Sequence, residues 1–265
     1  MSFSEELLLP SMGIIYQRKD FDGIVKVKPF TTKNYKDLLT GNASTAALTA
    51  FVSGCIEDCP VKVKDMNQND VLAILFKTRA MTLGNMLKTQ VKCPSCKHVE
   101  DVNWDLNNVE INYLGVEQYP IPVTLPVSNK EIKVRFPTGS DTTKAKNAAE
   151  KRSSKFNKDS DELQKIYTIV SLIDVDNMDL IEKADWYDTL PPQDAIYINE
   201  VFNEMGDVFG VKLTREAVCS SCDYSFNTYI DIGSDFFRPY NNVNLGITSK
   251  AGNLRGPIKK PDISE

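Results

Sequence analysis

The sequence predicts an α+β fold of two related halves, built from β-hairpins and helices and joined by a split four-cysteine zinc ribbon. Three observations predict it: a duplicated cysteine segment, strand patterns that alternate with period two, and amphipathic helical stretches between them. Each half carries these features in a similar order. An extended N-terminal arm precedes the halves and a C-terminal tail follows them.

The duplicated segments are Cys93-Pro94-Ser95-Cys96 and Cys219-Ser220-Ser221-Cys222. Nine residues after the last cysteine of each segment comes an aspartate, Asp105 or Asp231, which is followed by leucine or isoleucine. Each segment therefore predicts a strand, a tight CxxC knuckle and a returning strand.

Four thiolates are the number that a tetrahedral structural Zn²⁺ takes, and one knuckle supplies only two of them. We therefore predict that Cys93, Cys96, Cys219 and Cys222 bind one structural zinc per chain. Between Cys96 and Cys219 lie 122 residues, and closing a loop of that length costs roughly 4 kcal/mol of chain entropy. A structural zinc contributes on the order of 10–16 kcal/mol in small peptides, so the long separation is compatible with the site.

Other interpretations of the four cysteines remain open at this stage. Disulfides need an oxidising compartment, and a redox CxxC usually follows a βαβ pattern. The thiols can also be a set that lacks metal. Four thiolates leave no open position for water, which disfavours a catalytic zinc. His98, the single histidine, is an alternative ligand or a surface residue of the hairpin.

The composition is that of a soluble globular protein, with 42% hydrophobic and 25% charged residues. A net charge of −5 and a pI near 5.2 argue against nonspecific nucleic-acid binding as the main task. No apolar run approaches the ~20 residues that span a bilayer. The N-terminus carries acids where a signal peptide carries bases, so we expect synthesis in a reducing cytoplasm.

Residues 1–13 are predicted to form the extended arm, which packs either on a neighbouring molecule or on its own domain. Residues 14–115 are predicted to form the N-terminal α+β half. It begins with a β-hairpin over 14–30 around the Asp22-Gly23 turn, because this dipeptide favours tight hairpin turns. Helices follow, the strongest over 67–79 with Asn69 or Asp70 as its cap, and the first knuckle hairpin ends the half.

Residues 116–240 are predicted to form the C-terminal half. A hairpin over 121–136 contains Pro122 and Pro126, which lack amide donors, so we expect an edge strand there. Two amphipathic helices follow, the second ending at Gly206, and the second knuckle hairpin comes after them. Residues 241–265 have little periodicity and are predicted to form an extended or disordered tail.

Two further patterns have competing interpretations. Cys55 and Cys59 are spaced i, i+4 within a predicted helix, and are either core residues or two ligands of a metal; free cysteine packs as a small hydrophobe, which favours the core. The stretch 138–160 is locally basic, and is either a phosphate-binding loop or a solvated linker and helix start, the second being favoured.

The order of these features resembles the baseplate hub proteins of T-even-like, contractile-tailed bacteriophages, over residues 14–240. The marks that carry the resemblance are Lys28-Pro29-Phe30, a helix with Asp70 at its start and Lys77-Thr78-Arg79-Ala80 at its end, Leu83-Gly84, the first cysteine pair with Asp105-Leu106, Arg135-Phe136-Pro137, Trp186-Tyr187-Asp188-Thr189-Leu190, the second cysteine pair, and Asp235-Phe236-Phe237.

The resemblance implies a structural or assembly component of the tail baseplate hub, located in the virion and without enzymatic activity. Its implied partners are other baseplate and hub proteins and tail-tube or tape-measure proteins, and self-association is possible. An alternative is a chaperone of the tape-measure protein that leaves before the tail is finished. An alternative of another class is a zinc-ribbon nucleic-acid-binding protein. We also weigh an enzyme with a disguised site, but one histidine and the lack of a Walker A, dinucleotide or nucleophile-elbow motif disfavour it.

Overall fold

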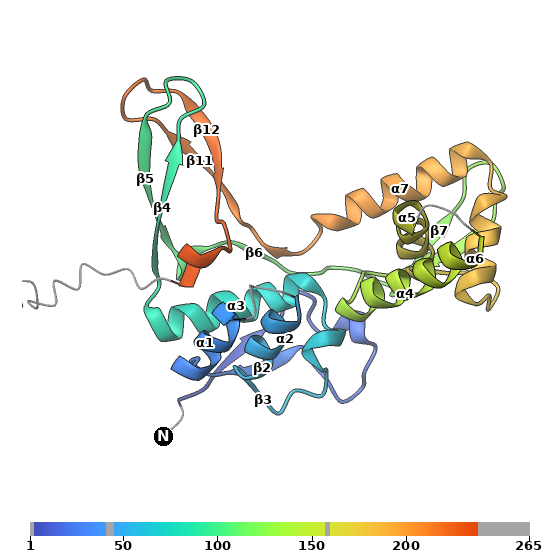
Figure 1. Cartoon of the computed structure of the whole chain (residues 1–265), viewed down its shortest axis with the longest axis horizontal. Helices are drawn as coiled ribbons and strands as arrows, with labels where there is room; N and C mark the ends of the chain where they lie inside the picture. Colours follow the sequence, from blue (N-terminus) through green and yellow to red (C-terminus); the bar gives the residue numbers. More distant parts are fainter. Residues whose placement is uncertain (1–2, 41–44, 157–159, 238–265) are drawn as a thin grey trace, which may run out of the picture.

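The computed structural model describes residues 3–40, 45–156 and 160–237 (Figure 1). In these ranges the chain forms seven α-helices, and its strands pair into five small antiparallel sheets. The α+β prediction is therefore confirmed. The predicted tail at 241–265 lies outside the described residues, and the domain boundaries at residues 13, 115 and 240 stay predictions.

The first lobe packs a three-stranded sheet and three helices around one apolar core, which includes Val25, Val27, Ile74 and Leu75. Its elements are β1 (Glu5–Leu8), β2 (Ile24–Val27), β3 (Ile56–Glu57), α1 (Thr32–Thr40), α2 (Thr45–Ser53) and α3 (Gln68–Leu83).

The predicted hairpin over 14–30 is wrong, because β2 pairs with β1 from the N-terminal arm. Ile14–Tyr16 forms one turn of 3-10 helix instead of a strand. Gly23 has a φ of 82°, and a Cβ there would lie 2.4 Å from the carbonyl carbon of Met12, so only glycine fits this close approach. The described part of the arm thus packs on its own chain, with Leu9 fully buried.

Helix α3 begins before its expected caps. The side chain of Asn67 accepts a hydrogen bond from the Asn69 amide at 2.8 Å, so Asn67 is the cap. Asp70 is fully buried and accepts hydrogen bonds from the Ser11 amide and from the hydroxyls of Ser11 and Tyr16. Burial raises the pKa of this carboxyl above its ordinary value, although the three donors oppose the shift.

The second lobe combines a three-stranded sheet with four helices. The predicted hairpin at 121–136 is confirmed, with β7 at the edge of the sheet order β7-β8-β9. The polar stretch after residue 138 begins a long helix, as the favoured interpretation expects. The elements are β7 (Ile121–Thr124), β8 (Glu131–Val134), β9 (Ile173–Asp174), α4 (Gly139–Phe156), α5 (Ser160–Ser171), α6 (Leu180–Asp188) and α7 (Pro192–Gly206).

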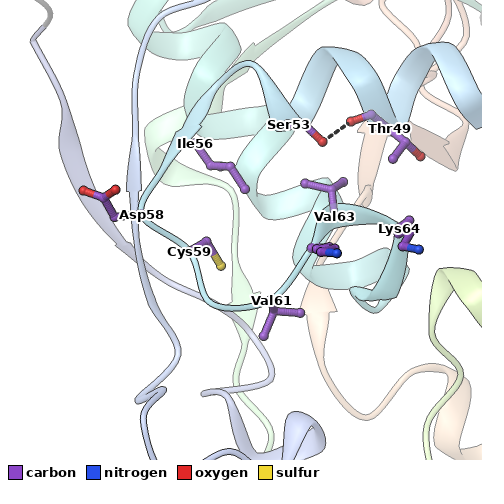
Figure 2. Close-up of a pocket in the computed structure, with 9 residues that line it drawn as sticks. Thr49, Ser53, Ile56, Asp58, Cys59, Val61, Val63 and Lys64 are labelled. Atoms are coloured by element: carbon purple, nitrogen blue, oxygen red, sulfur yellow. Dashed lines mark hydrogen bonds between the residues drawn. The ribbon is translucent and has the colours of Figure 1, made fainter.

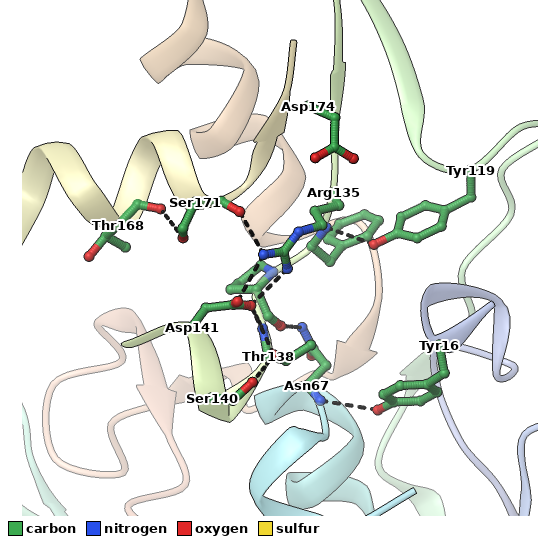
Figure 3. A network of polar contacts seen from close by, with 12 residues as sticks. Tyr16, Asn67, Tyr119, Arg135, Thr138, Ser140, Asp141, Thr168, Ser171 and Asp174 are labelled. Atoms are coloured by element: carbon green, nitrogen blue, oxygen red, sulfur yellow. Dashed lines mark hydrogen bonds and ion pairs between the residues drawn. The ribbon is translucent and has the colours of Figure 1, made fainter. Parts of the chain in front are cut away.

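A polar network fixes the start of α4 in the second lobe (Figure 3). Two nitrogens of the Arg135 guanidinium donate to the two carboxylate oxygens of Asp141, both at 2.8 Å, and one also donates to the Ser171 carbonyl. Burial opposes ionisation of Asp141, but the hydrogen bonds from Arg135 and Thr138 outweigh it, so the pKa of this carboxyl lies below its ordinary value.

The start of α3 joins the two lobes. The side-chain amide of Asn67 donates to the Pro137 carbonyl at 2.7 Å, and that of Asn69 donates to the Phe209 carbonyl at 2.7 Å. A Cβ on Gly210 would meet the Asn69 side chain at 2.8 Å. Beside this junction β6 (Ile111–Asn112) pairs with β10 (Gly210–Val211), where the chain passes to the second lobe and returns.

Candidate metal centre

Two β-hairpins stand side by side, begin near the end of α3 and extend away from the first lobe (Figure 1). The first consists of β4 (Met86–Lys92) and β5 (Val99–Asp105), and the second of β11 (Thr214–Val218) and β12 (Ser225–Tyr229). Both were predicted from the cysteine repeat, and the residue pairing confirms them.

The four predicted cysteines converge at the tips of these hairpins. All four Sγ atoms lie within 4.8 Å of one another. Cys93 and Cys222 are 3.8 Å apart, and Cys96 and Cys219 are 3.6 Å apart. These separations are far longer than the ~2.05 Å of a disulfide. They agree with a tetrahedron of sulfurs around Zn²⁺, because a Zn–S distance of ~2.3 Å gives edges of about 3.8 Å. The group can therefore hold a metal ion.

The two knuckles have the same backbone conformation. In each, the backbone amide and carbonyl of the first cysteine form hydrogen bonds across the turn. The fifth residue has a left-handed φ, which is 65° at Lys97 and 55° at Asp223. The corresponding backbone hydrogen bonds run from Cys93 N to His98 O (2.8 Å) and from Cys219 N to Tyr224 O (3.0 Å), then from Lys97 N to Cys93 O (3.0 Å) and from Asp223 N to Cys219 O (3.0 Å).

Burial differs within each knuckle in the same way. Cys93 and Cys219 are fully buried between the hairpins, whereas Cys96 and Cys222 are exposed at the tip. A metal ion bound here would have two buried ligands, Cys93 and Cys219, and two ligands that face solvent, Cys96 and Cys222.

Without a cation, the four neighbouring thiols do not all ionise together. A backbone hydrogen bond from His98 and a hydrogen bond from Cys222 lower the pKa of Cys96 to about 7. The Tyr224 backbone acts to lower the pKa of Cys222, but the neighbouring thiols outweigh it and raise that pKa to about 12. Ionisation of one thiol thus disfavours ionisation of its neighbours, whereas a divalent ion would stabilise all four as thiolates.

Side chains link the two hairpins below the thiols. Glu100 of the first hairpin accepts hydrogen bonds from the Ser220 amide at 3.0 Å and from the Ser220 hydroxyl at 2.8 Å. Further down, the Arg215 guanidinium of the second hairpin stacks 4.5 Å from the ring centre of Trp104 in the first. Trp104 is buried, and its indole donates to Thr89.

A buried arginine joins the bases of the two hairpins. Arg79, on α3, is fully buried and donates to the Gly84 carbonyl and, at 2.9 Å, to the Met86 carbonyl where β4 begins. It also donates to the Phe236 carbonyl at 3.1 Å, in the 3-10 turn η4 (Ser234–Phe237) that follows β12. The two hairpins therefore meet at both ends, through the four thiols at their tips and through Arg79 at their bases.

The sequence identified the four cysteines but not Arg79, Glu100 or the stack of Arg215 on Trp104. Arg79 had a detectable signal, because it lies four residues after Leu75, on the inner side of the helix. The contacts of Glu100 and Arg215 depend on how two distant hairpins face each other, which no local pattern contains.

The remaining cysteine-related predictions concern His98, Cys55 and Cys59. His98 lies exposed on the first hairpin, 3.9 Å from Glu100, and is not part of the thiol group. Helix α2 ends at Ser53, so Cys55 and Cys59 do not form a helical pair. Cys55 is fully buried and its thiol donates to the Phe51 carbonyl, and burial raises its pKa to about 11. Cys59 is half-buried in a shallow surface groove (Figure 2).

This fold and this site define a class: an α+β protein in which two hairpins, far apart in the sequence, bring four thiols together. Within the described residues no helix is long and apolar enough to cross a membrane. A family model described as T4 bacteriophage base plate protein matches residues 13–238. The match covers most of the chain, so the chain belongs to this family of phage baseplate proteins, as the resemblance at residues 14–240 predicted. No curated protein and no solved structure matches.

Proposed function

We propose that this chain is a non-enzymatic structural component of the baseplate hub of a contractile phage tail, and that one Zn²⁺ per chain stabilises it. The family match over residues 13–238 carries the baseplate part of the proposal. The assignment to the hub rests on the resemblance in the order of sequence marks.

The convergence of Cys93, Cys96, Cys219 and Cys222 supports the zinc part. Four sulfurs spaced at tetrahedral distances and drawn from two CxxC turns suit Zn²⁺, since thiolates are soft ligands and the geometry leaves no open position for a substrate. Bound there, the metal would join a strand pair near the middle of the sequence to one near its end. The chain would become a rigid building block, which a load-bearing assembly requires.

The proposed location is the tail of the virion after synthesis in the host cytoplasm, and the proposed partners are hub, baseplate, tail-tube or tape-measure proteins. A zinc-ribbon nucleic-acid-binding role is less well supported, because the net charge is −5 and the outer faces of the hairpins carry acids beside their lysines.

The test of the metal compares Cys96→Ser and Cys222→Ser with Cys59→Ser, a cysteine outside the group. Metal analysis of the purified parent chain and of Cys59→Ser should give one zinc per chain, and the first two variants should lose most of it and aggregate on heating. A metal-free parent chain with an unchanged melting temperature would exclude a structural zinc.

The test of the hub assignment is the protein content of purified phage particles. Mass spectrometry should detect this chain at a fixed ratio to the other baseplate proteins. Its absence from finished particles, together with its presence in assembly intermediates, would instead establish the departing chaperone.

A further inference from the structure

The outer face of α7 is an exposed helix face with both apolar and acidic side chains. One side of the helix packs into the second lobe through Ile198 and Met205. On the opposite side two neighbouring large apolar side chains are exposed, Ile196 by 58% and Tyr197 by 37%. The same side carries Glu200, Glu204 and Asp207, since these positions follow at helical spacing.

Glu200, Glu204 and Asp207 make this face negative, and further acids lie in the elements before α7. From residue 174 to residue 207 the sequence has ten acids and a single base, Lys183. Several of these acids have structural partners, as Asp194 does by accepting hydrogen bonds from the amides of Val127 and Ser128. Among the described residues, Glu200, Glu204 and Asp207 form no ion pair. Their charge is available to a basic partner.

The chain itself contains a segment of the complementary composition. Residues 238–261 include five bases and no acid, in a protein whose net charge is −5. Three of the bases, Arg255, Lys259 and Lys260, lie beside the apolar residues Leu254 and Ile258. Apolar side chains interleaved with bases match an outer face on which apolar side chains lie beside acids.

Contacts on α3 place the start of this segment within reach of α7. Asn69 binds the Phe209 carbonyl just after α7, and Arg79 binds the Phe236 carbonyl just before the segment. These two positions are ten residues apart, which is about 15 Å along a helix. Figure 1 shows α7 running from the second lobe back toward the hairpins. The sixteen residues 238–253 can span up to about 50 Å, so they suffice for the connection.

We propose that residues 254–260 dock on the outer face of α7 in the same chain, with Leu254 and Ile258 against Ile196 and Tyr197 and the bases against the acids. Tethering favours the same copy, because a short linker gives an effective concentration in the millimolar range. The face is then covered in the free protein. This inference depends neither on the metal nor on the assignment to the hub.

Carbodiimide crosslinking of the full chain tests the contact and its source. An equal mixture of ¹⁴N- and ¹⁵N-labelled protein is treated and digested, and the peptides are analysed by mass spectrometry. We expect amide links from Lys259 or Lys260 to Glu200 or Glu204, with both peptides carrying the same isotope. Links with mixed isotopes would show docking between copies and would overturn the proposal, and so would the absence of such links.

Charge reversal provides the second measurement. Glu200→Lys with Glu204→Lys should make proteinase K remove the C-terminal segment about tenfold faster, a change expected from losing a few exposed ion pairs and their apolar contact. Lys259→Glu with Lys260→Glu should accelerate this cleavage similarly. The variant with all four changes should be cleaved at about the parental rate.

The matched control is Glu117→Lys with Glu131→Lys, which alters the net charge equally at two other exposed glutamates. This control should cleave at the parental rate. Equal acceleration in the control, or no recovery in the fourfold variant, would mean that the segment does not dock on α7.

Discussion

The two cysteine hairpins have the same turn at their tips but very different strands. The first has seven-residue strands that bury Leu87, Val102 and Trp104 in the core of the first lobe. The second has five-residue strands in which the single buried residue is Thr228, a polar one. Equal tips with unequal strands indicate that the CxxC repeat determines the conformation of the tips. The first hairpin buries more apolar strand side chains than the second, which adds Ile230, just after β12, and the half-buried Ala217 to the same core.

The comparison assigns different roles to the hairpins. The first is part of the scaffold, because its inner face continues the core below it. The second has fewer buried apolar side chains and depends more on its other contacts: the thiols at the tip, Glu100 and Trp104 along its length, and Arg79 at its base. Removal of each contact should therefore affect the two hairpins unequally.

The largest difference is expected on removal of the proposed metal. A chelator should speed hydrogen exchange of the amides in 214–229 more than about 100-fold, a change that needs only ~2.7 kcal/mol of the energy that structural zinc supplies. The amides of 86–92 and 99–105 should change much less, because Leu87 and Trp104 hold them. Hydrogen-exchange mass spectrometry with and without chelator checks this, and Cys59→Ser serves as the metal-retaining control. Equal loss of protection in both hairpins would contradict the assigned roles.

The next difference concerns one aromatic residue in each hairpin. Trp104→Ala should destabilise the protein by about 3–5 kcal/mol, because it empties a buried site and removes the ring beneath Arg215. Phe226→Ala, at a half-buried position in the second hairpin, should cost about 1–2 kcal/mol. Urea unfolding of both variants in saturating zinc gives the two values. A larger loss for Phe226→Ala would reverse the roles of the hairpins.

Local chemistry explains which parts of this molecule the sequence could predict. The CxxC spacing and the alternation around it specify a turn and two strands, so both hairpins and their four thiols could be located. The C-terminal end of α7 and the β7–β8 hairpin also depend on neighbouring residues. By contrast, β1 pairs with β2 across a long connection, so the Asp22-Gly23 turn alone suggested the wrong partner for β2. The side chains of Asn67, Asn69 and Arg79 donate hydrogen bonds to backbone carbonyls far away in the sequence. No local pattern identifies such partners.

The smallest effect should come from Thr228, and it should be a gain. Its side chain is 3% exposed and its hydroxyl has no hydrogen-bond partner, so the second hairpin carries a desolvated polar group between the two sheets. Thr228→Val keeps the shape and removes that group, which should raise the free energy of unfolding by about 1 kcal/mol. Thr89→Val is the matched control, because the Thr89 hydroxyl accepts from the Trp104 indole at 3.1 Å and its removal should destabilise. Urea unfolding measures both.

Since the second hairpin lacks buried apolar strand residues, the gain should appear as slower hydrogen exchange in 214–229 even after chelation. Destabilisation by Thr228→Val would mean that the hydroxyl is solvated and that the two hairpins are packed less tightly than their contacts indicate.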